Sequence, residues 1–335
     1  MLHLIIPGLI LPPATLADAI AELPLPALSS LLGRGRVTWH PAQPLEHWLA
    51  QAFGMSAETV PYGALRLLGE GVDPADGIWV CADPVPLQLT HDKLIVGSPT
   101  ELDLDAAEAA QFIATLNAHF SDVGKFVAPH PARWYLRLSA QTAAELLPAR
   151  LHPLSSVVSR SMRPFLPTPP WQRLMNEIQM ALHGHPQNAA REATRKPRVG
   201  GVWLWGAGTL PTARIEPLEP VAALWANDAL ARGLAMQANI PRQPLPVQAT
   251  LADGMALLDT LAEAAQAVNV PAWRGAITLL EAEWLAPLLA ALKSRRLSAL
   301  RITALGDAGI ADIHVDAFDT WKFWRGPKTL ATLQP

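Results

Sequence analysis

Short apolar runs alternate with amphipathic helical segments through much of the second half of this chain. The runs expected to form strands are residues 202–205, 222–225, 276–280, 300–304 and 313–318, and the segments expected to form helices are residues 228–238, 251–268 and 284–292. Residues 2–6 are another apolar run and predict a buried first strand. Alternation of strand and helix is typical of a largely parallel sheet with helices on both faces. The sequence therefore predicts an α/β core.

Residues 78–150 differ from the rest of the chain, because several short strands flank a single amphipathic helix. The expected strands are residues 78–80, 85–89, 94–96, 126–127 and 134–138, and the expected helix is residues 106–120. This pattern is typical of a small α+β domain of the ferredoxin-like type. We therefore divide the chain into a first part of the core (1–77), an inserted α+β domain (78–150), a Pro-rich linker (151–169) and a second part of the core (170–335).

Composition and charge narrow the classes of partner. The 335 residues carry 26 basic and 29 acidic side chains, a net charge of −3, and no run of Lys or Arg, so we expect no nucleic-acid partner. The single cysteine, Cys81, rules out an intrachain disulfide and a cysteine-based zinc site. Prolines interrupt the apolar N-terminal segment, and no 18-residue apolar stretch occurs, so we expect a cytoplasmic protein that makes no membrane contact.

Tryptophan is unusually frequent, with 12 Trp against 2 Tyr. Scattered Trp side chains most often fill cores and domain seams, where the indole N–H finds a hydrogen-bond partner. Trp203 and Trp205 point the same way on the strand expected at 202–205, and we expect both to lie in the core.

A polar cluster follows the helix expected at residues 170–182. That helix is expected to end at Gly184 and Pro186. The polar residues His185, Asn188 and Arg191 lie directly at this helix end. The strand at 202–205 then leads into a Gly206-x-Gly208 turn, where backbone can approach a ligand closely. Ligands of open α/β sheets bind beyond the carboxyl ends of strands. The alternative is that Asn188 caps a helix after the proline and Arg191 lies in solvent.

Several motifs resemble the archaeal type of cofactor-independent phosphoglycerate mutase, a branch of the alkaline-phosphatase superfamily. Residues 25–35 (LPALSSLLGRG) resemble its TPNLDxLAxxG, and residues 62–72 (YGALRLLGEGV) with 77–84 (GIWVCADP) resemble GPLEALGxG followed by GDxxxRxN. Residues 185–191 (HPQNAAR) and 205–211 (WGAGTLP) resemble HPVNxxR and WGAGxxP. Residues 133–137 (RWYLR) and 176–180 (NEIQM) make the chain similar to a proteobacterial group labelled RpfE-type regulatory proteins.

This resemblance implies a three-layer α/β/α core with an inserted lid, and it allows the chemistry to be checked. The mutases hold two divalent metals, such as Mn or Zn, and pass the phosphoryl group through a serine. Pro7-Gly8 stands where their first strand ends in the metal ligand Asp-Gly, and residues 43–46 (QPLE) stand where the nucleophile lies. Residues 280–284 and 303–308 replace their Asp- and His-bearing strand ends. Asp307 and His314 remain as weak metal candidates, which are too few for a binuclear site.

The resemblance also singles out the residues expected to bind a ligand. They are His185, Asn188 and Arg191, the turn glycines Gly206 and Gly208, and Arg133 on the inserted domain. A guanidinium pairs bidentately with a carboxylate or phosphate, so a small phosphorylated or carboxylate metabolite is the expected ligand, with Arg191 at the mouth of its pocket. We expect no catalytic residue, no resident cofactor and no metal.

Three functions stay open at this point. The first is a catalytically inactive mutase-like protein that regulates by binding a metabolite or an unknown protein partner. The second is an active metal-dependent phosphomutase or phosphohydrolase with a relocated site. The third is a purely structural partner protein, which would show an exposed Trp-rich patch and no pocket at His185.

Overall fold

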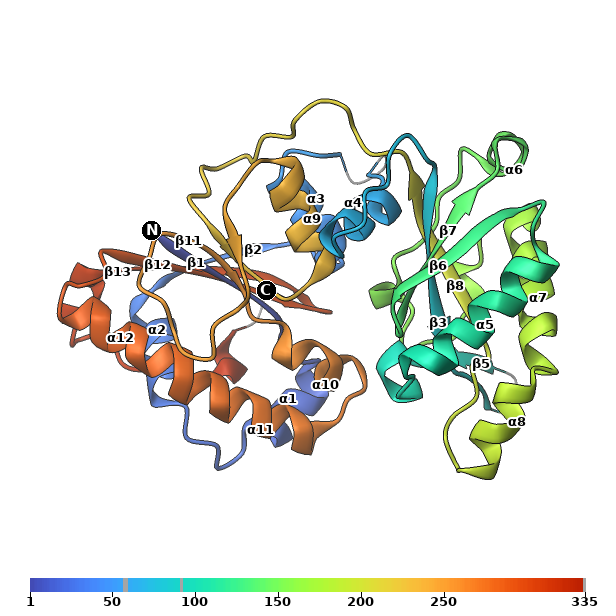
Figure 1. Ribbon diagram of the computed structural model, residues 1–335. Helices are drawn as coiled ribbons and strands as arrows, with labels where there is room; N and C mark the ends of the chain where they lie inside the picture. The colour runs from blue at the N-terminus through green and yellow to red at the C-terminus, as the bar shows by residue number, and fades with distance from the viewer. Residues whose placement is uncertain (57–59, 91–92, 334–335) are drawn as a thin grey trace. The chain divides into compact units, whose positions relative to one another are not determined.

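The computed structural model describes residues 1–56, 60–90 and 93–333. The chain forms two compact units, which we call unit 1 (Met1–Trp48 and Pro217–Pro335) and unit 2 (Leu49–Glu216). Both are visible in Figure 1. The α/β class expected from the sequence is confirmed, and each unit is described separately below.

Unit 1 is built on a sheet that, within the described residues, has seven strands in the order β10-β9-β11-β1-β12-β13-β2. Their bounds are β1 (Leu2–Ile10), β2 (Arg36–His40), β9 (Leu224–Trp225), β10 (Arg242–Gln243), β11 (Gly254–Leu257), β12 (Ala299–Gly306) and β13 (Gly309–Asp316). The strands from β10 to β12 run parallel, and β13 and β2 are antiparallel additions at one edge. The expected largely parallel sheet is therefore present.

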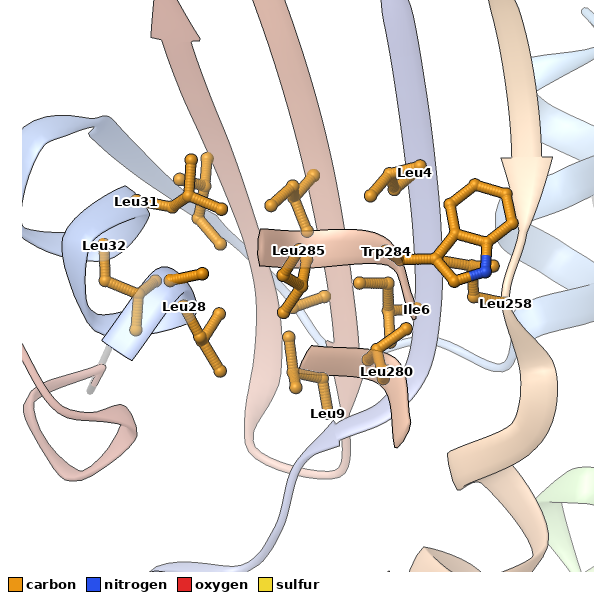
Figure 2. Packing of buried hydrophobic residues seen from close by; sticks show 14 of the residues in the cluster. Leu4, Ile6, Leu9, Leu28, Leu31, Leu32, Leu258, Leu280, Trp284 and Leu285 are labelled. Carbon is orange, nitrogen blue, oxygen red and sulfur yellow. The ribbon is translucent and has the colours of Figure 1, made fainter. Parts of the chain in front are cut away.

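Helices cover both faces of this sheet (Figure 1). One face carries α1 (Pro13–Ile20), α2 (Pro26–Arg34), α10 (Ala262–Gln266), α11 (Val270–Leu280) and α12 (Ala286–Lys293), and the other carries α9 (Ala229–Gln237). Figure 2 shows Leu285 between Leu28 of α2 on one side and Leu4 and Ile6 of β1 on the other, all within one hydrophobic cluster. Alternate residues of β1 enter this cluster because successive side chains of a strand point to opposite faces.

One long apolar helix of unit 1 meets the length and composition of a membrane span. It runs from Val270 to Lys293, and half of its most apolar window is buried. Trp273, Ile277 and Leu280 on this helix belong to the hydrophobic cluster of unit 1. Their spacing of three and four residues places them on one face, so the helix serves as a core helix in this fold.

Two segments of unit 1 differ from the sequence expectation. Residues 251–268 were expected to form one helix, but they contain the fully buried strand β11, a 3-10 turn and the short helix α10. Residues 276–280 were expected to form a strand, but they are the end of α11. Periodicity cannot separate a short apolar run in a buried strand from one in a buried helix. The edge strand β2 was not anticipated.

Unit 2 has the βαββαβ arrangement of ferredoxin-like domains. Its elements are β3 (Trp79–Val85), α5 (Ala106–His119), β6 (Gly124–His130), β7 (Arg133–Leu138), α7 (Pro169–His183) and β8 (Gly201–Gly208). The strands pair antiparallel in the order β6-β7-β3-β8. The ferredoxin-like expectation is thus correct in type, but its last helix and last strand lie outside the expected boundaries 78–150.

Unit 2 also contains residues that were assigned to the core and to a linker. These include α4 (Tyr62–Gly69) and α8 (Pro186–Ala193), while α3 (Leu45–Ala52) spans the boundary between the units. Strands β4 (Leu87–Thr90) and β5 (Lys93–Val96) form a hairpin, and α6 (Ala140–Leu146) follows β7. Residues 151–169 contain two 3-10 turns and bridge to β5 at Ser161 and Val158, so they are packed chain within unit 2.

Candidate functional site

Near its carboxyl end, β1 has a register shift between Pro7 and Ile10, and this part of the strand is packed against neighbouring helices. Gly8 has a φ of +79°, and a Cβ at this position would lie 2.8 Å from the Ala265 Cβ and from the Leu261 carbonyl oxygen. The Trp273 indole donates a 2.8 Å hydrogen bond to the Gly8 carbonyl. Glycine is therefore required for close packing, and the Pro7-Gly8 segment of β1 is closed off by packed apolar residues.

Two carboxylates lie at the carboxyl edge of the same sheet. Asp228 follows β9 and caps α9 through a 2.7 Å hydrogen bond from the Ala231 amide, and Asp259 follows the neighbouring parallel strand β11. Burial and the charge of Asp228 raise the pKa of Asp259. Catalytic and binding sites often contain a carboxyl group whose pKa is raised by a neighbouring carboxylate.

The weak metal candidates Asp307 and His314 do not come together. Asp307 is exposed in the turn between β12 and β13, whereas His314 lies in β13 opposite Arg301. A strand advances about 3.3 Å per residue, so the two side chains are separated by most of the length of β13. Among the described residues, no group of three or more His, Cys, Asp or Glu side chains is placed to hold a metal ion.

His185 and Asn188 support the start of α8 rather than line a pocket. The His185 ring caps this helix by accepting a 3.1 Å hydrogen bond from the Gln187 amide, and its Nε2 lies 2.9 Å from the Thr115 hydroxyl. Asn188 is fully buried and bonds the Leu182 carbonyl and both backbone groups of Val199 at 2.8–3.0 Å. The capping residue is thus His185, and Asn188 joins α7, α8 and the start of β8.

Arg191 is buried, and each of its three nitrogens has a partner inside unit 2. Its Nε donates to the Pro197 carbonyl at 2.8 Å, one terminal nitrogen donates to Glu108 at 2.7 Å, and the other donates to the Leu102 carbonyl. The side chain is only 1% exposed. Both sequence expectations for its position, the mouth of a pocket and the solvent, are therefore wrong. Buried charges are tolerated when they are paired and hydrogen-bonded, as here.

The turn glycines also have a packing role. A Cβ at Gly206 would lie 2.5 Å from the Tyr62 Cβ, and Gly206 has a φ of +65°, which side chains rarely adopt. A Cβ at Gly208 would lie 2.7 Å from the Pro61 Cβ. Both glycines therefore let the end of β8 approach the start of α4.

Arg133 belongs to a polar network that runs from the surface of unit 2 into its interior. It bonds Glu70 through two nitrogens, and the Tyr135 hydroxyl donates to the same carboxylate at 3.2 Å. Burial alone would raise the pKa of Glu70, but hydrogen bonds from Arg133 hold it below its usual value. The carboxylate of Glu70 therefore already compensates the positive charge of Arg133.

The interior end of this network is an ion pair between α4 and β3. Two nitrogens of Arg66 donate to the Asp83 carboxylate at 2.9 and 2.6 Å, and its Nε donates to the Tyr135 hydroxyl at 3.0 Å. The Trp205 indole donates to Asp83 at 2.7 Å. The Arg66 guanidinium also lies over the rings of Tyr135 and Trp205. Trp203 and Trp205 are both buried, as expected.

Sequence reasoning missed a second network, on the face of the unit 1 sheet opposite the hydrophobic cluster. The His3 Nε2 lies 2.7 Å from the Thr303 hydroxyl, which donates to Asp312 at 3.1 Å. Arg301 bonds the same Asp312 and reaches Glu219. Burial and the charge of Arg301 lower the pKa of His3 to about 3. The only sequence signal was a polar residue inside each apolar run.

Unit 2 contains a small cavity beside the first residues of β8. It measures about 100 Å³, and its lining includes Leu87, Met162, Met175 and Trp203 together with three amide side chains. Ligand pockets are usually on the order of 300–1,000 Å³, so this cavity is small for a metabolite. The predicted ligand residues do not line it.

Four exposed aromatic side chains gather on one short segment of unit 1. Phe318, Trp321, Phe323 and Trp324 are 61–83% exposed, and we call them the aromatic surface. The segment begins with a 3-10 helix, Ala317–Trp321, that packs on α12. Phe323 and Trp324 meet edge to face, with their ring centroids 5.3 Å apart. Trp321 and Trp324 are therefore exceptions to the general expectation that tryptophans fill cores and domain seams.

Comparisons with known proteins give likenesses of fold. No family model matches the chain, and no curated protein matches it. A cofactor-independent phosphoglycerate mutase from Thermoplasma acidophilum DSM 1728 is similar in structure, with 14% identity, a TM-score of 0.49, and coverage of 98% of this chain and 93% of that one. A protein from Pyrococcus horikoshii is similar with 16% identity, a TM-score of 0.48, and coverage of 98% and 91%. At these identities the likeness concerns the fold alone.

Proposed function

We propose that this chain is a non-catalytic regulatory protein that acts by binding a protein partner through the aromatic surface. The observation that carries the proposal is the exposure of Phe318, Trp321, Phe323 and Trp324 within seven consecutive residues. Leaving such side chains in water is costly, at about 1.5–3 kcal/mol for a fully buried Phe relative to an exposed one. Contiguous exposed apolar residues mark interaction sites, and Trp is enriched among the residues that dominate binding energy.

The residues expected to bind a metabolite support this choice over a small-molecule function. The donors of Arg191 are occupied by Glu108 and by two carbonyls, and Asn188 is fully bonded within unit 2. The bulged end of β1, which would have to bear a metal ligand, is packed against α10 and α11. Binding of a phosphorylated or carboxylate metabolite at these residues is therefore not part of the proposal.

Photo-crosslinking from single positions in the full chain tests the proposal. A photoreactive phenylalanine analogue at Phe323 or Trp324 should give the same discrete adduct in extracts of the source cells. Leu89 and Val247 are both 79% exposed, so the same analogue at these two positions is the matched control. The proposal requires the adduct to be absent from both controls. Equal adducts at all four positions, or none at Phe323 and Trp324, would contradict it.

A second candidate function is metal-assisted phosphotransfer at a relocated site, which Asp228 and Asp259 favour. Carboxylates at the carboxyl edge of parallel strands are suited to bind a divalent cation beside a substrate. Purified chain should then turn over 3-phosphoglycerate with added Mn²⁺ at about 1 s⁻¹ or faster, the low end of ordinary enzyme rates. Loss of this turnover in Asp259→Asn would establish the second candidate and remove the first.

A further inference from the structure

Arg295 lies across two rings of the aromatic surface. Its guanidinium carbon is 5.3 Å from the centroid of the Phe318 ring and 5.9 Å from that of the Trp321 ring. Arg295 is exposed, and within the described residues it makes these ring contacts without a carboxylate partner. Stacking on aromatic rings fixes the plane of a guanidinium while its edge N–H groups remain able to donate. The Arg295 guanidinium is therefore held in a fixed orientation at the protein surface, where its N–H groups can donate hydrogen bonds to a ligand.

The two segments that carry Arg295 and the aromatic surface are rich in cations, although the chain as a whole is acidic. Residues 293–298 and 316–328 carry the side chains of Lys293, Arg295, Arg296, Lys322, Arg325 and Lys328, against the two acids Asp316 and Asp319. Asp319 is buried and is paired with Lys322 at 2.5 Å. The net charge of the whole chain is −3, so positive charge is concentrated here. The packing of α12 on the 3-10 helix brings the two segments together.

The ring contacts favour one class of anionic partner. Insertion of Phe318 and Trp321 into a lipid layer would carry the Arg295 charge into hydrocarbon, which is unfavourable. Stacking of nucleic-acid bases needs open ring faces, but Arg295 takes up one face of Phe318 and one of Trp321, and Phe323 and Trp324 pack edge to face, which reduces the area open to bases. A carboxylate approaching in the plane of the guanidinium meets neither obstacle and can bond two N–H groups.

We infer that the partner presents an acidic peptide segment, that Arg295 binds one of its carboxylates, and that the aromatic surface receives apolar residues beside that carboxylate. This inference rests on the proposed function and specifies the chemistry of its partner. Arg295 orients the bound carboxylate, the cations of the two segments attract the acidic segment, and the four aromatic rings provide apolar surface that the partner buries. The three contributions predict a partner segment in which Asp or Glu alternates with large apolar residues.

Selection from a random peptide library displayed on phage, with the immobilised full chain as bait, tests the inference. Enriched peptides should contain Asp or Glu next to Leu, Phe or Trp, and one such peptide should bind in solution. Replacing its acidic residues by Gln or Asn should weaken binding about tenfold or more, the loss expected for a charge-assisted hydrogen bond. Raising the salt concentration should also weaken binding, because exposed charges are screened.

Variants of the chain separate this inference from the proposed function. Arg295→Gln should bind the selected peptide about tenfold more weakly, and Arg295→Lys should recover little, because a lysine lacks the planar fork. Phe323→Ser should also lose binding, while Arg232→Gln, an exposed arginine elsewhere in unit 1, should not. Unchanged melting curves verify that each variant folds. Selection of purely apolar peptides that need Phe323 but not Arg295 would overturn the inference and leave the proposed function standing.

Two further probes are measured against the same immobilised chain. Oligothymidylate and vesicles of phosphatidylglycerol with phosphatidylcholine should each bind more weakly than the selected peptide. Tighter binding of either probe that is lost in Phe323→Ser would assign the surface to nucleic acid or to membrane, and would overturn the inference. Failure of every probe, with no peptide enriched over the Phe323→Ser variant, would overturn the inference and the proposed function together.

Discussion

The guanidinium of Arg191 donates a 2.7 Å hydrogen bond to the carboxylate of Glu108, 83 residues earlier in the chain. This contact ties α8 to the first turn of α5, where Glu108 also closes a capping box with Asp105. Gln187 donates to the same carboxylate at 3.1 Å. A residue that the sequence places among ligand-binding candidates is therefore a structural link within unit 2.

Arg191→Ala should destabilise unit 2. Removing one partner of a buried ion pair typically costs about 3–5 kcal/mol, because the other charge is left without compensation. Chemical denaturation of wild type and variant measures this difference in the free energy of unfolding. Arg173→Ala, at an exposed position of α7, is the matched control and should change it by less than about 0.5 kcal/mol. A stable Arg191→Ala chain would show that the pair contributes little.

The sequence predicted the type of both units better than their extents. The period of apolar residues identified most helices, and the alternation of elements identified the parallel sheet. The sequence pattern could not show that β8 pairs with β3, because a buried apolar run such as residues 202–205 could be a strand of either sheet. Pairing between residues far apart in sequence is fixed by packing and register, which local patterns do not contain.

Arg66 and Asp83 should show strong coupling in a double-mutant cycle. Asp83→Leu leaves the buried Arg66 guanidinium without its carboxylate, so it should cost about 3–5 kcal/mol. The double variant with Arg66→Met removes both charges and should be more stable than Asp83→Leu alone. Thermal and denaturant unfolding of the four chains gives the coupling energy. Strictly additive effects would contradict the buried pair.

Gly206→Ala should destabilise the chain because the added Cβ meets Tyr62 and the backbone has a positive φ. The strain and the overpacking together should cost about 2–4 kcal/mol. Gly184→Ala is the control, since a Cβ there has no neighbour within 4 Å. Equal melting temperatures for the two variants would refute the close approach of β8 and α4.

His3 should make the stability of unit 1 depend on pH. The folded His3 stays neutral down to about pH 3, whereas an unfolded histidine takes up a proton near pH 6.5. The unfolded state therefore binds more protons between these values, so the free energy of unfolding is highest above pH 6.5. It should fall by up to about 1.4 kcal/mol per pH unit as the pH drops through this window.

Denaturant unfolding of His3→Gln between pH 7 and pH 4 checks this dependence. The variant should lose most of the slope between these values, and His40→Gln, on the exposed edge strand β2, should keep it. An unchanged slope in His3→Gln would mean that other groups cause the acid sensitivity.

The candidate sites were less predictable than the fold. The sequence singled out His185, Asn188 and Arg191 as ligand-binding candidates, but their partners on α5, α7 and the chain before β8 are set by tertiary structure. The contact of His3 with Thr303 joins residues 300 positions apart. The cations around Arg295 escaped notice because they come from two segments, neither of which contains a long basic run.

Quantitative affinity purification of the tagged full chain from its source cells measures directly whether the aromatic surface binds a protein partner. Wild type is compared with the double variant Trp321→Ser/Phe323→Ser and with the control Leu89→Ser/Val247→Ser, all at equal abundance. We expect a stoichiometric protein partner to accompany wild type and the control and to be lost from the aromatic-surface variant. Retention of the same partner by all three chains would show that the aromatic surface does not bind it.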